Sequence, residues 1–323
     1  MILTLARQLR QVGVLGINRR NRDCVLAYNP RRLYPLADDK LRIKQLAQQA
    51  GIAVPELYGV VEYEGQAKTI HAMLHGRDSF VVKPASGSSG KGIVVISQRY
   101  KDMYRKASGV LMDEGELRHH VFNILSGMFS LGGQQDKALF EYMVQFDPVF
   151  DQVSYLGVPD IRIIVYRGVP VMCMVRLPTR MSDGRANLHQ GAVGAGINMA
   201  TGYTCSAVCR NRNVKEHPDT GYDVTGIQVP YWDRLLDMAT RSSDLTGLGY
   251  LGVDLVLDRD KGPMLLELNA RPGLTIQIAN QAGLLLRLQQ VDREVGNLPD
   301  RLTRIAFAKQ HFSTAFLGSV ATA

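Results

Sequence analysis

The chain has 323 residues, of which 46% are apolar and 21% charged, and this balance is typical of a globular protein rather than a disordered or fibrous one. Its formal net charge of +8 predicts anionic partners, which could be nucleotide phosphates, acidic metabolites or nucleic acid. No apolar run approaches the roughly 18 residues that span a bilayer. The four cysteines have neither zinc-site nor disulfide spacing, so we expect reduced thiols in a cytoplasmic protein.

The arginine-rich opening, MILTLARQLRQVGVLGINRR, contains no acidic residue before Asp23. Such a pattern is typical of an amphipathic helix that docks on the body of a protein, and also of a mitochondrial presequence. We favour the docked helix. A secretory signal is not expected, because the apolar start ends at Arg7.

Helix and strand signals alternate over the first part of the chain. Asp38 and Asp39 precede KLRIKQLAQQAG, whose apolar positions and closing Gly51 predict a capped helix. Further on, short β-branched runs predict strands, and a longer mixed pattern predicts a helix. These elements are strands at 80–82 and 93–96, a helix at 115–131 and a short buried strand at 138–144.

The second part of the chain predicts several strands and one helix. IRIIVYRGVPVMCMVRLP contains two β-rich runs around Arg167-Gly168, which is a hairpin signal. GVDLVLD and MLLELNARPG predict two more strands, joined by the turn DRDKGP. Between the two pairs we expect an irregular, glycine-rich stretch at 187–202 and a helix at 227–245, and the residues after about Val291 are amphipathic.

The stretch VVKPASGSSGKGIVVIS, residues 81–97, places a Ser/Gly loop between two strands. It is not a Walker-type loop, because Gly92 follows Gly90-Lys91 where a Ser or Thr is required, and a strand follows instead of a helix. The loop could be a flap whose backbone N–H groups close over phosphate oxygens, with Lys83 adding a point charge. The alternative is an ordinary solvated turn.

The two predicted strands near the end of the chain carry three oxygen ligands. Glu267 and Asn269 are two positions apart, so a strand turns both side chains to one face. On the partner strand, the apolar residues share one face and Asp254 lies on the other. Two carboxylates and an amide oxygen suit Mg²⁺, which completes its shell with water and substrate phosphates. Arg271 falls on the same face by alternation. The alternative is an exposed sheet face with solvated charges.

A third group of polar residues lies in the central hairpin. Asp160 and Arg162 share one face of the first strand, Arg176 ends the second, and the segment NLHQGAVG with Asn187 follows. Arginines on adjacent strands form a fork that suits carboxylate or phosphate. Cross-strand arginines are also common on plain surfaces, and His189 alone is more typical of a structural residue than a catalytic one.

Taken in order, these motifs resemble the ATP-grasp carboxylate–amine ligases. The set is DK at 39–40, VVKPASGSSGKGI, LFEYMV, DIR…R, NLH, GVD and LELNARPG, and within the family it is similar to the alpha-L-glutamate ligase-like proteins, related to the ribosomal-protein glutamate-ligase branch. The resemblance implies an α+β ATP-grasp fold in which two α+β subdomains hold the nucleotide. It covers about residues 38–290, with a lid at about 55–145, a catalytic subdomain at 146–290 and a tail at 291–323.

The resemblance also implies roles for individual residues. The implied magnesium ligands are Asp254, Glu267 and Asn269, and the positions facing phosphates and the reacting carboxylate are Arg162, Arg176, Asn187 and Arg271. The implied nucleotide contacts are Lys40, Lys83, the flap residues Ser86, Gly87, Ser88, Ser89, Gly90, Lys91 and Gly92, the hinge Glu141, Tyr142 and Met143, and Asp147 at the ribose.

The expected function is therefore ATP-dependent amide formation. With ATP and Mg²⁺ (two ions, with Mn²⁺ as a substitute), a small-molecule or peptide carboxylate would form an acylphosphate that an amine, such as glutamate or another amino acid, then attacks. The alternative is a non-catalytic ATP-binding regulatory module of the same fold. Nucleic-acid binding is disfavoured because no recognised binding motif accompanies the basic residues. No membrane partner is expected, and a homo-oligomer is left open.

The sequence departs from the resembled ligases before Asp38. Those proteins carry a separate N-terminal domain, whereas the 37 residues here are too few for a core of their own, which predicts a truncated pre-grasp region. In its place stands the basic segment GINRRNRDCVLAYNPRRLYP. A solvated segment is the simpler interpretation, and support of an acidic substrate by Arg31 and Arg32 is the alternative hypothesis. The loop at 146–160 has no assigned role.

Overall fold

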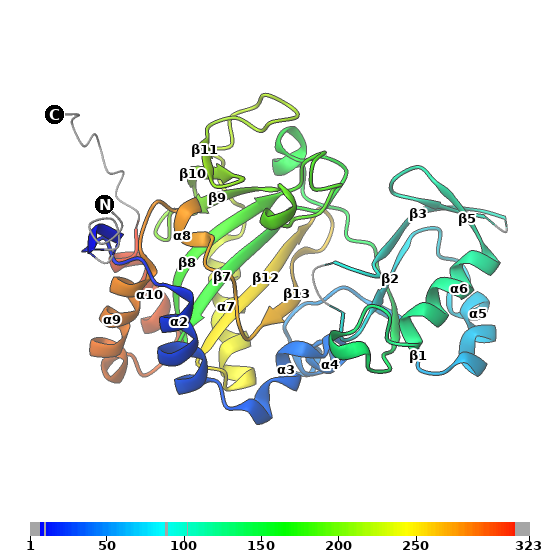
Figure 1. Ribbon diagram of the computed structural model, residues 1–323, viewed down its shortest axis with the longest axis horizontal. Coiled ribbons are helices and arrows are strands. Elements are labelled where there is room, and N and C mark those ends of the chain that lie inside the picture. The colour runs from blue at the N-terminus through cyan, green and yellow to red at the C-terminus, as the bar shows by residue number, and fades with distance from the viewer. Residues whose placement is uncertain (1–6, 10, 88–89, 102, 314–323) are drawn as a thin grey trace. The chain divides into compact units, whose positions relative to one another are not determined.

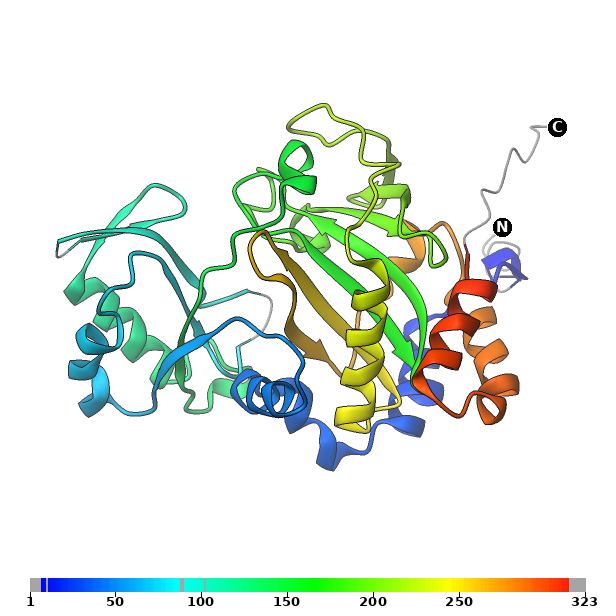
Figure 2. The ribbon, with the colours of Figure 1, turned by 180° about the vertical axis from the view of Figure 1, so that it is seen from behind.

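The computed structural model describes residues 7–9, 11–87, 90–101 and 103–313, and it divides the chain into two compact units. The smaller unit consists of residues 38–145. The larger unit combines the segment before residue 38 with the chain from residue 146 onward. The basic N-terminal segment thus packs within the larger unit. Figures 1 and 2 show both units, each built around one twisted sheet.

The smaller unit contains a six-stranded antiparallel sheet in the order β1-β6-β2-β3-β4-β5. Its core lies beneath α5 and α6, where Phe80, Tyr104 and Phe140 pack with edge-on or tilted rings. The elements are α4 (Lys40–Gln49), β1 (Leu57–Val61), α5 (Ile70–Met73), β2 (Phe80–Pro84), β3 (Val94–Tyr100), β4 (Met103–Lys106), β5 (Leu111–Asp113), α6 (Glu114–Leu125) and β6 (Ala138–Glu141).

Local sequence explains where the helices of this unit begin and end. The predicted helix after Asp39 is confirmed: the Asp39 carboxylate accepts hydrogen bonds from the backbone N–H groups of Leu41 and Arg42. The prediction of a helix over 115–131 was wrong at its end, because α6 stops at Leu125. Gly127 adopts φ +84°, and a Cβ there would lie 2.2 Å from the Gln134 carbonyl oxygen, so the chain must turn.

The larger unit contains a seven-stranded antiparallel sheet in the order β11-β10-β9-β8-β7-β12-β13. Helix α7 packs on β7 and β12, and α10 packs on β8 and α7, covering one face as Figure 2 shows. The strands are β7 (Asp160–Tyr166), β8 (Val169–Leu177), β9 (Val193–Ile197), β10 (Thr204–Cys209), β11 (Arg212–Val214), β12 (Tyr250–Asp258) and β13 (Gly262–Asn269). The helices are α2 (Ile17–Arg20), α3 (Pro35–Asp38), α7 (Trp232–Thr246), α8 (Ile276–Ala279), α9 (Leu284–Glu294) and α10 (Arg301–His311).

Both predicted hairpins of the larger unit are confirmed. Arg167 and Gly168 take φ of 50° and 79° between β7 and β8, as a two-residue turn with left-handed residues requires. β12 and β13 pair antiparallel on either side of the predicted turn. The helix expected over 227–245 begins later, at Trp232, because Tyr231 adopts a left-handed conformation with φ 57°.

The prediction of an irregular stretch at 187–202 was wrong for its centre, where β9 forms. Glycines in a strand usually weaken it, but here they allow close packing. A Cβ on Gly194 would lie 2.7 Å from Leu188, and one on Gly196 would lie 2.5 Å from the Ala279 carbonyl oxygen. The glycine-rich composition therefore reflects the approach of neighbouring segments to the sheet rather than a loop.

The N-terminal segment of the larger unit consists of short helical turns, not one long helix. Of the predicted docked helix, residues 1–6 and 10 lie outside the described residues, and Gly13 takes φ 75° before α2 begins at Ile17. A π-helical turn spans Asn21–Leu26 and a 3-10 turn spans Arg31–Leu33. Among the described residues, no helix has both the length and the apolar character needed to cross a membrane.

Asn29 fixes this segment to the start of β12. Its side-chain amide donates to the carbonyl oxygens of Tyr250 (2.7 Å) and Ala270 (2.9 Å) and accepts from the Tyr250 N–H (2.9 Å). All these groups are buried, so replacing the amide leaves several backbone groups without partners.

We therefore expect Asn29→Ala to lower the free energy of unfolding by about 2–4 kcal/mol, measured by urea denaturation. The exposed Asn297, whose side-chain amide donates to Glu294 in the same turn, provides the matched control. Asn297→Ala should change stability by less than about 0.5 kcal/mol. Equal stability of the two variants would contradict the anchoring role of Asn29.

Candidate functional site

A buried ion cluster joins α4, β2 and β6 in the smaller unit. The Glu141 carboxylate lies 2.5 Å from Lys83 Nζ and 2.8 Å from Lys44 Nζ. All three side chains are less than 5% exposed. Buried charges are costly unless they are paired with good geometry, so the single carboxylate between the two ammonium groups holds both lysines in place.

The ionisation of this cluster follows from its burial and its unequal charges. Burial lowers the pKa of Lys44 to about 8; Glu141 opposes this shift, and Lys83 adds to it. Burial would also raise the pKa of Glu141, but the charges of Lys83 and Lys44 outweigh it and keep that pKa below its ordinary value. Glu141 is thus ionised, and the pKa of Lys44 lies closer to neutral pH than that of an ordinary lysine.

The flap between β2 and β3 is tied down where it starts. Lys40 Nζ donates to the Gly87 carbonyl oxygen at 2.6 Å, and both oxygens of Asp136 accept from the Ser86 N–H at 3.0 Å. At its other end, Gly92 takes φ +74° and a Cβ there would lie 2.6 Å from the Phe129 ring. Lys40 and Ser86–Gly87 are thus brought together, while Ser88 and Ser89 lie outside the described residues.

The residues predicted to contact the nucleoside form hydrogen bonds with neighbouring residues. The Tyr142 N–H donates to the Glu56 carbonyl oxygen at 2.8 Å, and the Gln145 amide donates to the Met143 carbonyl oxygen at 3.3 Å. Asp147 belongs to the larger unit, where its carboxylate accepts from the Val149 N–H and caps a short turn. Their contacts with a nucleotide remain predictions.

In the larger unit, the register of β12 and β13 brings the three predicted metal ligands together. Asp254 stands directly opposite Glu267, and Asn269 stands opposite Gly252, two positions along the same strand pair. Asp254 is fully buried, whereas Glu267 and Asn269 are half-buried. The pairing of these two strands that was predicted from the sequence is therefore present, and two of the three residues are partly exposed.

The arginines of the central hairpin bind the same carboxylate from the other side. Arg162 on β7 pairs with Asp254 across the strands and donates through Nε to Oδ1 at 2.7 Å and through Nη2 to Oδ2. Arg176 on β8 donates through Nη2 to Asp254 Oδ2 at 2.9 Å. It also binds both oxygens of Asp160 at 2.5 Å. One continuous network thus links β8, β7 and β12.

This network fixes the ionisation of its members. Burial opposes ionisation of Asp254, but Arg162 and Arg176 overcome it and hold the pKa of Asp254 well below its usual range. Burial would lower the pKa of Arg176, yet Asp160 and Asp254 raise it. Burial raises the pKa of Asp160 to about 7, against the pull of Arg176. The negative charge of the network therefore concentrates on Asp254.

Asn187 and Arg271 lie outside this network. The Asn187 side chain accepts from the His189 N–H at 3.0 Å and caps a short 3-10 turn. Strand β13 ends at Asn269, so alternation does not determine the direction of Arg271. Instead, the Arg271 guanidinium lies 5.3 Å from the centre of the Tyr34 ring in a cation–π contact.

Three residues of these clusters were not among the predicted site residues. Lys44 follows Lys40 by one helical turn of α4, and its position on the buried face of that helix was the available signal. Asp160 was noted on the same face as Arg162 but was given no role. Asp136 carries no signal in the sequence, because its contact with Ser86 spans fifty residues of chain.

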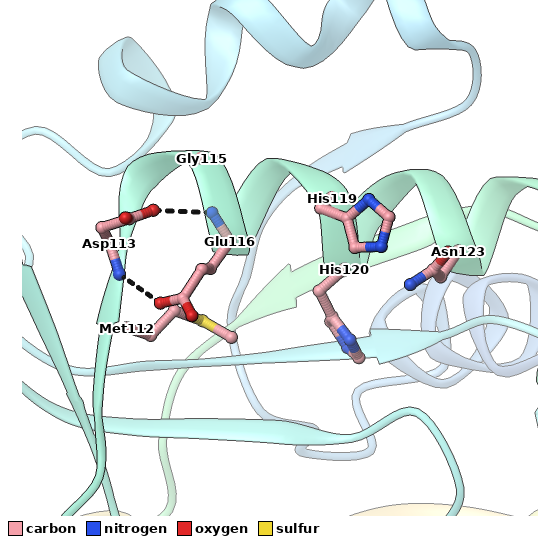
Figure 3. Close-up of a pocket in the computed structure, with 7 residues that line it drawn as sticks. All are labelled: Met112, Asp113, Gly115, Glu116, His119, His120 and Asn123. Atoms are coloured by element: carbon pink, nitrogen blue, oxygen red, sulfur yellow. Dashed lines mark hydrogen bonds between the residues drawn. The ribbon is translucent and has the colours of Figure 1, made fainter.

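A separate pocket of about 540 Å³ lies along α6 of the smaller unit (Figure 3). It contains none of the predicted site residues. Asp113 and Glu116 cap the helix reciprocally at one end, and His120 Nε2 lies 3.0 Å from the Gly92 carbonyl oxygen at the end of the flap. Burial lowers the pKa of His120. The pocket is lined by Met112, Asp113, Gly115, Glu116, His119, His120 and Asn123.

Comparison with known protein families identifies the family of this chain. The model of the sugar-transfer associated ATP-grasp family matches residues 19–293, most of the chain. The chain belongs to the sugar-transfer associated ATP-grasp family. The predicted ATP-grasp resemblance and the α+β fold class are confirmed by this membership.

The curated relatives are distant. A "Probable alpha-L-glutamate ligase" of Trichodesmium erythraeum is 24% identical over 284 residues, which cover 86% of this chain and 72% of that protein. A protein of the same name from Maridesulfovibrio salexigens is 25% identical over 238 residues, 73% of this chain and 56% of that protein. The chain thus spans between about half and three quarters of these two relatives.

Solved structures with similar folds are more distant still. The ATP-grasp ligase PsnB complexed with minimal precursor is 15% identical, with a TM-score of 0.46, over 83% of this chain and 62% of that chain. D-alanine–D-alanine ligase from Bacillus anthracis is 14% identical, with a TM-score of 0.43, over 86% of this chain and 68% of that chain.

The unequal charges around Glu141 predict opposite pKa changes at Lys44 in two variants. Glu141→Gln removes the carboxylate that raises the pKa of Lys44, so that pKa should fall below about 8. Lys83→Met removes a neighbouring positive charge, so the pKa of Lys44 should rise. Side-chain NMR of labelled lysine over pH 6–11 measures both changes.

The control for this experiment is Lys137→Met, which removes an exposed lysine paired with Glu62 in the same unit and should leave the titration of Lys44 unchanged. Shifts of the same sign in the Glu141 and Lys83 variants would contradict the cluster as described.

Proposed function

We propose that this protein is an ATP- and Mg²⁺-dependent carboxylate–amine ligase that forms an amide bond through an acylphosphate. The observation that carries the proposal is the Asp254–Glu267 cross-strand pair, bound on its other side by Arg162 and Arg176. These residues come from the motifs that resemble the ATP-grasp ligases. Membership in an ATP-grasp family and the names of the distant relatives support the same reaction class.

The charge and chemistry of this cluster fit Mg²⁺. The carboxylate-bearing residues Asp254 and Glu267 stand directly opposite each other on β12 and β13, and Asn269 follows two positions along β13. Glu267 and Asn269 are half-buried, and their hard oxygen atoms are the ligand type that Mg²⁺ prefers. Bound there, the metal would withdraw charge from the phosphates of ATP. Asp254 would serve both the metal and the two arginines, since a carboxylate accepts about four hydrogen bonds or ligand contacts.

The arginines are suited to stabilise phosphate charge. Each guanidinium carries five N–H donors, which is more than the ion pairs with Asp160 and Asp254 use. Those ion pairs fix both side chains before a substrate arrives, and fixed donors stabilise a transition state better than donors that must reorganise. Arg162 and Arg176 would thus act as preorganised donors to the transferred phosphoryl group.

The smaller unit supplies a second set of phosphate-binding groups. Lys83, held by Glu141, and Lys40, held by the Gly87 carbonyl oxygen, carry positive charge beside the flap. The flap backbone would contribute N–H donors to phosphate oxygens. Both lysines are fixed by a bond to the protein, so they would bind the nucleotide with little loss of side-chain entropy.

The reaction then needs no covalent enzyme intermediate. A substrate carboxylate oxygen attacks the γ-phosphorus and ADP leaves, which gives the acylphosphate. An amine nitrogen attacks the acyl carbon, the bond to phosphate breaks, and the amine releases a proton. The protein contributes mainly position and electrostatic stabilisation. We take L-glutamate as the first substrate to test, because the curated relatives are named for it.

The first experiment is a screen for ADP formation. Purified protein, ATP and Mg²⁺ are combined with L-glutamate and a panel of amino acids and peptides, and ADP and new amide masses are measured. A ligase forms ADP only when both an acid and an amine are present. Slow hydrolysis that is indifferent to both would favour the alternative, a nucleotide-binding regulatory module.

Variants of the metal cluster test which residues carry the activity. Glu267→Gln and Asp254→Asn should each lower the rate of amide formation on the order of 100-fold or more, because each removes a charge that binds Mg²⁺ or orders the arginines. Asp260→Asn is the matched control: Asp260 lies in the turn after β12 and pairs with exposed Arg259. If the Glu267→Gln and Asp260→Asn variants formed amide at equal rates, the cluster would not be the metal site.

A further inference from the structure

The loop that follows the metal-ligand strand is held by the N-terminal segment. Residues 270–272 come directly after Asn269, and the N-terminal segment is the dark blue ribbon from α2 to α3 in Figure 1. Arg20 Nη1 donates to the Pro272 carbonyl oxygen at 3.2 Å, and the Asn29 amide donates to the Ala270 carbonyl oxygen at 2.9 Å. Both donors are buried. The backbone on either side of Arg271 is therefore fixed.

The side chain of Arg271 also meets this segment. Its guanidinium lies over the ring of Tyr34, and the Tyr34 N–H donates to the Arg31 carbonyl oxygen at 3.1 Å in a 3-10 turn. Residues three apart in such a turn lie on the same side. Arg31 and Tyr34 thus share one side of the turn, and the Arg271 guanidinium lies over the ring that extends from that side.

Arg31 and Arg271 differ from the other arginines discussed above in their acidic partners. Arg162 and Arg176 are neutralised by carboxylates, and in the N-terminal segment Asp23 pairs with Arg19 and Arg22. Arg31 and Arg271 are exposed, and within the ranges that the structure describes neither has an acidic partner. A guanidinium held over an aromatic ring keeps N–H groups available, and two of them can bind a carboxylate or phosphate through parallel hydrogen bonds.

We propose that Arg31 and Arg271, arranged on Tyr34, form an anion subsite that binds a carboxylate of the amino-acid or peptide substrate. This rests on the proposed ligase function and adds to it a substrate class: an acid with a carboxylate besides the one that is activated. Arg271 lies two residues beyond the candidate metal ligand Asn269, and Arg31 comes from the basic N-terminal segment. Phosphate groups share this chemistry, so the experiment separates the two anions.

The experiment is isothermal titration calorimetry of L-glutamate, L-glutamine and, separately, the magnesium complex of a non-hydrolysable ATP analogue. Arg31→Gln and Arg271→Gln should each raise the Kd of L-glutamate by about tenfold, because each removes one charge-assisted contact. L-glutamine lacks the second carboxylate. Its Kd for the wild-type protein should therefore be at least as high as the Kd of L-glutamate for these variants. The Kd of the ATP analogue should stay the same.

Matched variants separate recognition from folding. Arg32 is exposed in the same turn but lies about a third of a turn away from Arg31, so Arg32→Gln should change the Kd of L-glutamate by less than about twofold. Tyr34→Phe keeps the ring beneath Arg271 and should leave the Kd of L-glutamate unchanged. Tyr34→Ala removes the ring and should raise that Kd. Equal effects of Arg31→Gln and Arg32→Gln would overturn the subsite.

The other outcomes are equally decisive. If the variants weaken only the ATP analogue, the anion is a nucleotide phosphate and the assignment of a substrate carboxylate is wrong. If wild-type protein does not bind L-glutamate, the subsite is rejected. L-glutamate binding that depends on both arginines, without ADP formation in any mixture, would keep the subsite and reject the ligase. Glutamate-dependent ADP formation that is unaffected in both variants would keep the ligase and reject the subsite.

Discussion

The hydrogen-bonded ion network of Asp160, Arg176, Asp254 and Arg162 is the interaction on which the candidate site depends. It crosses three adjacent strands, and three of its members, Asp160, Arg162 and Asp254, are buried. Removing one partner would leave an unpaired buried charge, which costs more than the pair contributes. The strands must therefore keep their register, and with it Glu267 and Asn269 on β13 keep their place beside Asp254.

The smaller unit also pairs its buried charges, with one carboxylate between two lysines. Glu141 between Lys83 and Lys44 leaves a buried excess of positive charge, which suits an anionic nucleotide. The network of the larger unit pairs two carboxylates with two guanidinium groups, and the oxygen ligands of Glu267 and Asn269 beside it suit a divalent cation. These two features are the physical basis of the proposed Mg·ATP chemistry.

The N-terminal segment is attached to the larger unit through the loop that follows β13. Its buried polar side chains bond the backbone at both ends of the loop 270–272. Such local bonds need no core of their own, because they use the surface of an existing sheet. The exposed arginine of the following turn then becomes part of the larger unit's surface, where it can contribute to specificity.

The sequence by itself determined much of the fold and part of the site. Period-two alternation placed Glu267 and Asn269 on one face, and turn residues defined both hairpins, because these signals depend only on neighbouring residues. It did not find β9, whose glycines reflect contacts with Leu188 and Ala279, nor the helix end at Leu125. The tertiary structure alone decided the roles of Lys44 and Asp136 and the cation–π contact of Arg271 with Tyr34, because each depends on a partner that is close in space and distant in sequence.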